Sequence, residues 1–520
     1  MIGQAVGPFT QGGLDEPLGL AVGLGPVGPG EGMFDDVGLA DGMDELRVVA
    51  HAVVSEDAPD LDALAGSMGK RPQNKYLCSS MYLTWRNLSG QIILQSTATR
   101  RTPTLMPPSR TKKIAFVDAF AGCGGLSLGL LQAGLEGKFA IERDRFAFDT
   151  LQTNLLGKNS KARFAWPRWL PKAPIDINEF LHRYEQQLKD LTGRIDVLVG
   201  GPPCQGFSSA GRRHIDDPRN QLFEAYLKFV RIINPKVVLI ENVRGFTIDF
   251  KAKGQIKNYS QTLREKLEEN YEVFEELLDL SQFGVPQGRT RYFLLALMPG
   301  LCQGNPFDIL RADLPSFLRS LQLNVPVSSW AAISDLEVSR CGVTPSTETS
   351  GFEEICYSSP RTQYQRLMNE GVTPTDLRMA RHSREVVDRF KVIIETSHAE
   401  GRLNTTISEE IRTRFDLKKR ALRVLDPERP SPTITSLPDD LLHYSEPRTL
   451  TVRENARLQS FPDWFRFKGK YTTGGHLRRK EVPRFTQVAN AVPPLVAHAF
   501  GRLLLELFRS DRNRVTGSSG

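Results

Sequence analysis

Cysteines are few in this 520-residue chain and stand far apart, so no Cys-x-x-Cys pair occurs. No cluster of cysteine and histidine has the spacing of a zinc site either. We therefore expect neither a metal nor a disulfide framework, as is usual in a reducing cytoplasm. The six cysteines are Cys78, Cys123, Cys204, Cys302, Cys341 and Cys356.

Positive charge is absent from the start of the chain. Residues 1–45 hold eight Asp and Glu, many Gly and no Lys or Arg, a composition typical of disorder. The rest holds all 67 Lys and Arg against 52 of the 60 acids. This basic balance favours a polyanionic partner such as nucleic acid. We find no signal peptide and no apolar run long enough to span a bilayer, so we expect a cytoplasmic protein.

The first 110 residues form an extension whose role the sequence leaves open. Strands are expected at residues 76–85 and 91–94, and a basic, Pro-containing linker follows. Most of the extension reads as disordered, or as lying before a later translation start at Met68, Met81 or Met106.

An alternating α/β pattern begins at residue 114. Ile114–Asp118 is a buried-strand pattern, and a Gly-rich turn and an apolar helix follow it. The next strand ends at Glu142, where a carboxylate suits the two hydroxyls of a ribose, although a helix-capping acid is an equal alternative. A short strand is expected at residues 174–177 and contains Asp176.

The run from Ile195 to Gly201 reads as a buried parallel strand that a Gly-Gly-Pro-Pro bend stops just before Cys204. A lone cysteine is most often a small buried hydrophobe. In an open α/β sheet, however, ligands bind beyond the carboxyl ends of the strands. The next strand, residues 236–240, ends at Glu241, so a candidate nucleophile and an acid fall at one edge of the sheet.

Downstream of this pair, residues 263–275 read as a helix. Gln287, Arg289 and Arg291 then alternate as the chain enters another strand, so they share one face. Two arginines at the rim of a crevice are suited to hold a phosphate or a base carbonyl.

Six motifs in this order resemble the cytosine-C5 DNA methyltransferases, over about residues 113–297 and 448–505. They are residues 120–127 (FAGCGGLS), 201–208 (GPPCQGFS), 241–243 (ENV), 287–291 (QGRTR), 453–462 (RENARLQSFP) and 487–494 (QVANAVPP). One departure is Ala489, where the family usually has Gly.

The resemblance implies S-adenosylmethionine as the methyl donor and no metal. It makes Cys204 the nucleophile and Glu241 its acid partner. It also implies that Arg289 and Arg291 bind the target base and the DNA backbone. The cofactor residues that it implies are Phe120, Gly122, Gly124, Gly125, Glu142, Asp176, Ile177, Leu222, Asn490 and Val492.

The expected architecture is an α/β fold: a Rossmann-like parallel-sheet catalytic domain at residues 111–297, completed by 448–510. Residues 298–447 lose the α/β pattern, and by their position they resemble the family's inserted, smaller mixed α/β target-recognition domain. We expect Gln287, Thr433 and Thr435 to contact the DNA substrate.

The resemblance implies a monomer that acts on double-stranded DNA near the nucleoid, with a restriction endonuclease or other defence protein as a possible partner. A tRNA methyltransferase of the same fold and a non-catalytic DNA-binding homologue are the alternatives. The insertion of about 150 residues favours DNA, because a domain of that size exceeds what the tRNA enzymes tend to carry.

Overall fold

The chain divides after Arg110 into two compact units, and each is described by itself. The computed structural model describes residues 45–51, 80–88, 91–92, 95–96, 113–202, 220–248, 250–252, 255–473 and 480–517. In the first unit, β2 (Ser80–Leu88) pairs antiparallel with β1 (Glu45–His51), β3 (Gln91–Ile92) and β4 (Gln95–Ser96). Strands β2 and β3 overlap the two expected strands, whereas the acidic residues 1–44 lie outside the described residues.

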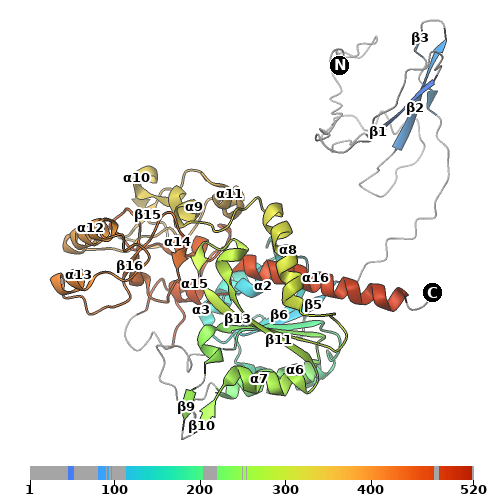
Figure 1. The fold of residues 1–520 in the computed structure, drawn as a ribbon, viewed down its shortest axis with the longest axis horizontal. Helices are drawn as coiled ribbons and strands as arrows, with labels where there is room; N and C mark the ends of the chain where they lie inside the picture. The colour runs from blue at the N-terminus through green and yellow to red at the C-terminus, as the bar shows by residue number, and fades with distance from the viewer. Residues whose placement is uncertain are drawn as a thin grey trace. The chain divides into compact units, whose positions relative to one another are not determined.

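A six-stranded sheet forms the centre of the second unit (Figure 1). Four neighbouring strands are parallel, and two antiparallel strands extend the sheet at one edge. This is the Rossmann-like α/β fold expected from the sequence. In spatial order the strands are β11 (Glu272–Asp279), β13 (Thr290–Leu297), β8 (Val237–Val243), β7 (Val197–Gly200), β5 (Ala115–Ala119) and β6 (Glu136–Ile141).

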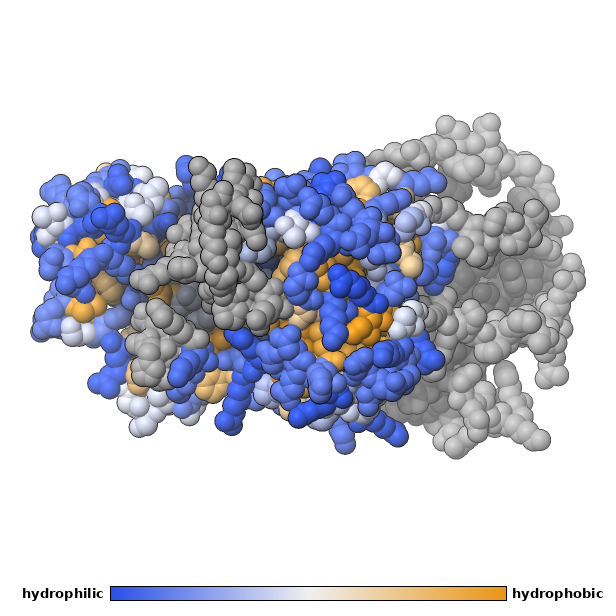
Figure 2. Space-filling model, turned by 90° about the horizontal axis from the view of Figure 1, so that it is seen from below, coloured by the Kyte–Doolittle hydropathy of each residue, from blue (hydrophilic) through white to orange (hydrophobic). Residues whose placement is uncertain are grey.

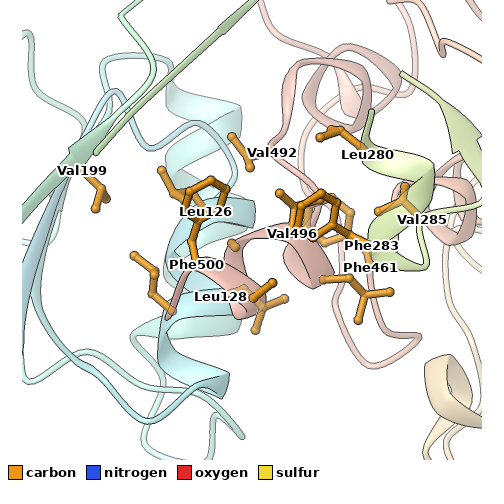
Figure 3. Packing of buried hydrophobic residues seen from close by; sticks show 14 of the residues in the cluster. Leu126, Leu128, Val199, Leu280, Phe283, Val285, Phe461, Val492, Val496 and Phe500 are labelled. Atoms are coloured by element: carbon orange, nitrogen blue, oxygen red, sulfur yellow. The ribbon is translucent and has the colours of Figure 1, made fainter. Parts of the chain in front are cut away.

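Helices cover both faces of this sheet, because alternate residues of its strands point into two separate cores. Val199 lies in one core and Leu198 in the other. Figure 3 shows Leu126 and Phe500 packed together in the first core. Helices α2 (Gly125–Gln132), α3 (Arg145–Leu155) and α16 (Pro494–Gly517) cover one face, and α4 (Ile177–Arg183), α5 (Glu185–Lys189), α6 (Asn220–Ile233) and α7 (Tyr259–Glu268) cover the other.

The strand register brings the ends of four strands to one edge. Ala119 of β5 pairs with Ile141 of β6 and with Gly200 of β7, which in turn pairs with Ile240 of β8. Strand β13 runs the other way, so its first residues lie beside the last residues of β8. The residues that follow β5, β6, β7 and β8 therefore lie at the same edge of the sheet as the start of β13.

The segment of residues 484–512 is long and apolar enough to cross a membrane, contrary to our expectation, but 78% of its most apolar window is buried. Gly129 explains the close packing of α16 on α2, because a Cβ there would lie 2.3 Å from the Pro494 carbonyl oxygen. This segment is therefore a core element. The described atoms on the face seen in Figure 2 are mostly hydrophilic, with hydrophobic residues in limited patches.

Residues 298–333 pack with the body. Helix α8 (Pro306–Ser320) places Phe307 and Phe317 in the first core, and Ile333 of α9 (Ser329–Ile333) joins it. Two smaller cores lie further along, one around Leu336, Ile355 and Leu377 and one spanning residues 390–442. The independently packed part of the insertion therefore starts about 35 residues after position 298.

Some buried residues of the following segment, such as Tyr364 and Met368, belong to the first core. The rest of the insertion consists mostly of short elements. They are α10 (Val338–Cys341), β14 (Val343–Pro345), β15 (Glu353–Ile355), α11 (Gln363–Asn369), α12 (Arg384–Ala399), α13 (Glu409–Arg414), β16 (Arg423–Val424), β17 (Ser431–Pro432) and β18 (Leu441–Leu442), with the 3-10 turns η3 (Ser334–Leu336) and η4 (Pro438–Asp440).

The independently packed part of the insertion, residues 334–442, forms a lobe. Buried ion pairs join this lobe to the body of the second unit through α14 (Val452–Leu458). The Arg457 guanidinium is fully buried and donates to both carboxylate oxygens of Asp463, at 2.5 and 2.6 Å, and to Asp335, at 3.2 and 3.3 Å. Removing one partner of such a network would leave an uncompensated buried charge, so the network fixes how the two parts meet.

The expected helix at residues 263–275 is wrong in its second half. Helix α7 ends at Glu268, and β11 begins at Glu272 as the edge strand of the sheet. Pairing with β13 over eight residues outweighs the helix propensity of the Glu and Leu side chains. Between β8 and α7 lie the 3-10 turn η1 (Arg244–Thr247) and a hairpin of β9 (Phe250–Ala252) and β10 (Gln255–Lys257).

Candidate active site

A tight turn follows β5 and places the backbone of the Gly-rich motif at the sheet edge. Phe120, Gly122 and Gly124 have φ values of 64°, 56° and 97°, in the left-handed region that favours glycine. Nothing lies within 4 Å of the Cβ that Gly122 lacks, so the turn leaves open space there. Half-buried Phe120 stacks on Tyr226 of α6, with ring centroids 6.3 Å apart.

The Glu142 carboxylate is fixed by two backbone donors at the end of β6. Its Oε2 accepts from the Gly122 N–H at 2.9 Å and its Oε1 from the Asp144 N–H at 2.7 Å. Burial raises the pKa of Glu142, although these hydrogen bonds lower it. The side chain is half-buried, so a ligand can reach a carboxylate whose orientation the turn determines.

The strand expected at residues 174–177 is not formed. Asp176 is the N-cap of α4, and its side chain accepts from the Asn178 N–H at 2.8 Å, because an aspartate before an apolar helix satisfies a free N–H. The segment still lies beside Glu142, whose carbonyl accepts from the Ile175 N–H at 2.8 Å. Ile177 and Leu222 are buried, with 2% and 6% exposure.

Helix α15 (Arg484–Asn490) brings the end of the chain to the same edge. The Asn490 side chain is exposed at the last residue of the helix. Val492 lies so close to α2 that its carbonyl oxygen would be 2.4 Å from a Cβ on Gly125. Val492 therefore lies against the Gly-rich turn, and Asn490 precedes it by two residues.

Replacing Gly125 with Ala is expected to destabilise the fold by about 1–3 kcal/mol, because the added methyl group meets backbone that cannot easily give way. Cofactor affinity should fall as well, since Val492 must move. Thermal unfolding and calorimetric binding of S-adenosylhomocysteine measure the two effects. Gly288→Ala is the control, because its Cβ would meet only the Ser431 carbonyl oxygen at 3.7 Å. Equal behaviour of the two variants would contradict the close packing.

Glu241 lies next to the backbone that leads to Cys204. A Cβ on Gly201 would be 3.4 Å from the Glu241 Oε2, and the Asn242 side chain donates to the Pro202 carbonyl at 3.1 Å. Asn242 belongs to the motif at residues 241–243, but no role was expected for its side chain. Cys204 itself lies outside the described residues, which resume at residue 220.

Arg291 and Arg289 surround this carboxylate with positive charge. The Arg291 Nε lies 3.2 Å from the Glu241 Oε1. Burial nevertheless raises the pKa of Glu241 more than Arg291 and Arg289 lower it. Arg289 is 3% exposed and donates to the Ala489 carbonyl of α15 at 2.9 Å, while its buried Nε and Nη1 have no hydrogen-bond partner among the described residues.

Gln287 was expected to contact DNA, but its side chain is fully buried and its amide is used inside the protein. The Gln287 Nε2 donates to Gln459 at 2.7 Å, and its Oε1 accepts from the Ile434 N–H at 3.0 Å. Thr433 is brought to the same place and donates to the Gly288 carbonyl at 3.0 Å, whereas Thr435 donates to Asp440. Gln287 therefore joins the body to the lobe.

Asp118 is a buried acid that sequence reasoning missed. It lies in β5, and Ser127 of α2 donates a hydrogen bond to it. Burial raises the pKa of Asp118 to about 7, against the lowering effect of Ser127. An acid inside an otherwise apolar strand was the signal that could have found it.

Two of the described cysteines have a raised pKa, which makes them poor nucleophiles. Burial raises the pKa of the Cys123 thiol to about 12, and it raises the pKa of Cys341. Within the described ranges, no group of three His, Cys, Asp or Glu side chains could hold a metal ion.

Residues 114–506 match the family described as C-5 cytosine-specific DNA methylase. The chain belongs to this family. Type II methyltransferase M.DdeI of Desulfomicrobium norvegicum is 32% identical to this methylase over 406 residues, which cover 76% of the chain and 89% of the relative. Type II methyltransferase M.XorII of Xanthomonas oryzae pv. oryzae is 28% identical over 410 residues, 76% of the chain and 85% of the relative.

A solved structure supports the fold of the methylase. The putative DNA modification methyltransferase of an E. coli prophage aligns with a TM-score of 0.51 and 24% identity, over 76% of this chain and all of that one. The methylase is thus an enzyme of DNA cytosine methylation, and its family uses S-adenosylmethionine as the methyl donor.

Proposed function

We propose that this methylase transfers a methyl group to C5 of a flipped-out cytosine in a specific duplex sequence, through a covalent adduct with Cys204. The observation that carries the proposal is the Glu241–Arg291 pair beside Gly201 and Pro202. Cys204 follows Pro202 by two residues, so their Cα atoms are at most about 7 Å apart. This short separation along the chain supports the pairing of Cys204 with Glu241.

The turn and α15 support a cofactor site for S-adenosylmethionine, which supplies a methyl group on a sulfonium. The fixed Glu142 carboxylate can accept from ribose hydroxyls, and open space at Gly122 lets a ligand approach the backbone. Asn490 offers an exposed amide on the opposite side. Asp176 and Ile177 would lie toward the adenine, with Phe120, Gly124, Gly125, Leu222 and Val492 around the rest of the site.

The chemistry follows from the electronics of the base. C5 of cytosine is a weak nucleophile, so the Cys204 thiolate adds to C6 and moves the double-bond electrons toward C5. A protonated Glu241 can donate to N3 as negative charge develops, and Arg291 can hold the ring carbonyl. C5 then takes the methyl group, loses its proton, and the bond between sulfur and C6 breaks. Because the ring is stacked in a duplex, the base must be flipped out first.

The lobe around residues 334–442 would read the target sequence, with Thr433 near the junction and Thr435 beyond it. Helix α12 carries exposed Arg384 and Lys391, and α13 carries Arg414, residues suited to phosphate contacts. The type II names of the two relatives support a restriction–modification or defence setting, with a cognate endonuclease as partner. In this setting the methylase would be a cytoplasmic monomer that acts on double-stranded DNA.

Purified protein is expected to transfer tritiated methyl groups from S-adenosylmethionine to unmethylated genomic DNA and to leave tRNA unlabelled. Nucleoside chromatography should place the label in 5-methyldeoxycytidine. Label that appears only in tRNA would favour the RNA-directed alternative. A folded, cofactor-binding protein that labels neither substrate would support the non-catalytic alternative.

A further inference from the structure

Helix α15 contacts the lobe at its first residue and lies at the two proposed ligand sites at its other end. Its first residue, Arg484, reaches the turn between β14 and β15 in the lobe. Its sixth residue, Ala489, accepts a hydrogen bond from Arg289 at the proposed target-base site. Its last residue, Asn490, is exposed at the proposed cofactor site. The helix has seven residues and is therefore only about 10 Å long.

The contact between α15 and the lobe is made of charged hydrogen bonds. The Arg484 Nη1 donates to the Glu348 Oε2 at 2.6 Å and to the Asp376 Oδ1 at 2.8 Å. The Tyr471 hydroxyl donates to the same Glu348 oxygen at 2.9 Å. Burial raises the pKa of Glu348, but the hydrogen bond and charge of Arg484 outweigh it, so the net pKa is lowered. Glu348 is thus a carboxylate at neutral pH.

Aromatic contacts add to this junction. The Arg484 guanidinium carbon lies 4.1 Å from the Tyr471 ring centroid, and that of Arg378 lies 3.6 Å from the same centroid. Arg378 also lies 4.1 Å from the centroid of Phe352, which follows the same turn as Glu348. Two rings and two guanidinium groups thus connect the turn to the start of α15.

A shift at Arg484 would be transmitted to the elements that α15 contacts, because close-packed interiors transmit strain. The Gln487 side chain donates to the carbonyls of Lys468 and Val482 at 2.9 and 3.0 Å and accepts from the Thr150 hydroxyl of α3 at 2.7 Å. Packed elements of this kind move as units.

We propose that Glu348, Tyr471 and Arg484 are positioning residues that form a clasp, through which the lobe sets the position of α15 and so couples DNA binding to cofactor binding. The inference rests on the proposed function. Because binding coupling is reciprocal, DNA that fixes the lobe raises cofactor affinity by the same factor by which cofactor raises DNA affinity. The clasp residues are not among those assigned above to either ligand.

The test measures the dissociation constant of S-adenosylhomocysteine by calorimetry, with and without saturating sheared, unmethylated genomic DNA. The full-length wild-type chain is expected to bind it about fivefold or more tightly with DNA. Glu348→Gln and Tyr471→Phe should bring this factor close to one, and the affinity measured without DNA should stay within about twofold. Tyr471→Phe removes only one hydroxyl group, so this variant tests the clasp if Glu348→Gln does not fold.

Glu481→Gln is the matched control. It removes an ion pair with Lys470, at 2.8 Å, within the segment before α15 and without contact to the lobe, so it should keep the wild-type factor. A wild-type factor of one, or variants that keep the wild-type factor, would overturn the clasp. Tritium incorporation into the same DNA separates the two ideas: methylation with unchanged coupling refutes the clasp alone, whereas absent methylation refutes the proposed function.

Discussion

Cys204→Ser is expected to abolish both methyl transfer and the covalent capture of DNA that carries 5-fluorocytosine. Fluorine at C5 cannot leave as a proton does, so the wild-type thiolate stays bonded to C6 once the methyl group has been transferred. A serine hydroxyl is far less ionised at neutral pH, and we expect the rate to fall by about 10⁴-fold or more. Denaturing electrophoresis detects the adduct, and binding to ordinary DNA should persist because the basic surface is unchanged.

Cys356→Ser is the matched control, because Cys356 is only partly buried and is a free thiol in the lobe. It should form the adduct as the wild type does. Peptide mapping of the captured complex then identifies the attached residue. An adduct on a different cysteine, or none from a preparation that demonstrably methylates DNA, would remove Cys204 from this role.

Glu241→Gln is expected to lower kcat by about 10²- to 10⁴-fold, because the amide cannot donate a proton to N3. The affinity for S-adenosylhomocysteine should stay near that of the wild type, since the cofactor residues are elsewhere. Burial raises the pKa of Glu241, so the protonated form persists to higher pH than for an exposed glutamate. Activity that needs this proton is present below that pKa and declines as the pH rises through it.

The pH profile separates a proton donor from a merely structural residue. The variant should lose the alkaline decline that Glu241 causes in the wild type. Glu272→Gln, which changes an exposed carboxylate at the start of β11, should keep the wild-type rate and profile. A Glu241→Gln enzyme with wild-type kcat would show that the acid is not needed.

The parallel strands of the sheet could be predicted from the sequence, because strands that are buried on both faces are nearly continuous apolar runs. Residues 197–200 and 237–240 are apolar, and they belong to the parallel strands β7 and β8, which bring Glu241 to the edge beside Gly201. The end of β6 at Glu142 follows from the same pattern. The positions of these strand ends were therefore predictable from the sequence.

The sequence misleads where the same residues fit two local structures, or where a residue far along the chain determines the contacts of a side chain. Asp176 before an apolar residue fits a strand or a helix cap, and the free N–H groups of α4 favour the cap. Gln287 alternates with Arg289 as expected, but only the fold reveals that Gln459 takes up its amide. The Glu348–Arg484 contact joins residues 136 positions apart, so no local pattern could indicate it.

The most direct test of the account is to map 5-methylcytosine in the DNA of a host that expresses this chain and lacks cytosine methylation of its own. If the methylase acts as proposed, 5-methylcytosine appears at one short recurring sequence, and none appears when the host expresses Cys204→Ser. Unmethylated DNA from cells that contain the folded wild-type protein, or the same methylation with the Cys204→Ser variant, would contradict it.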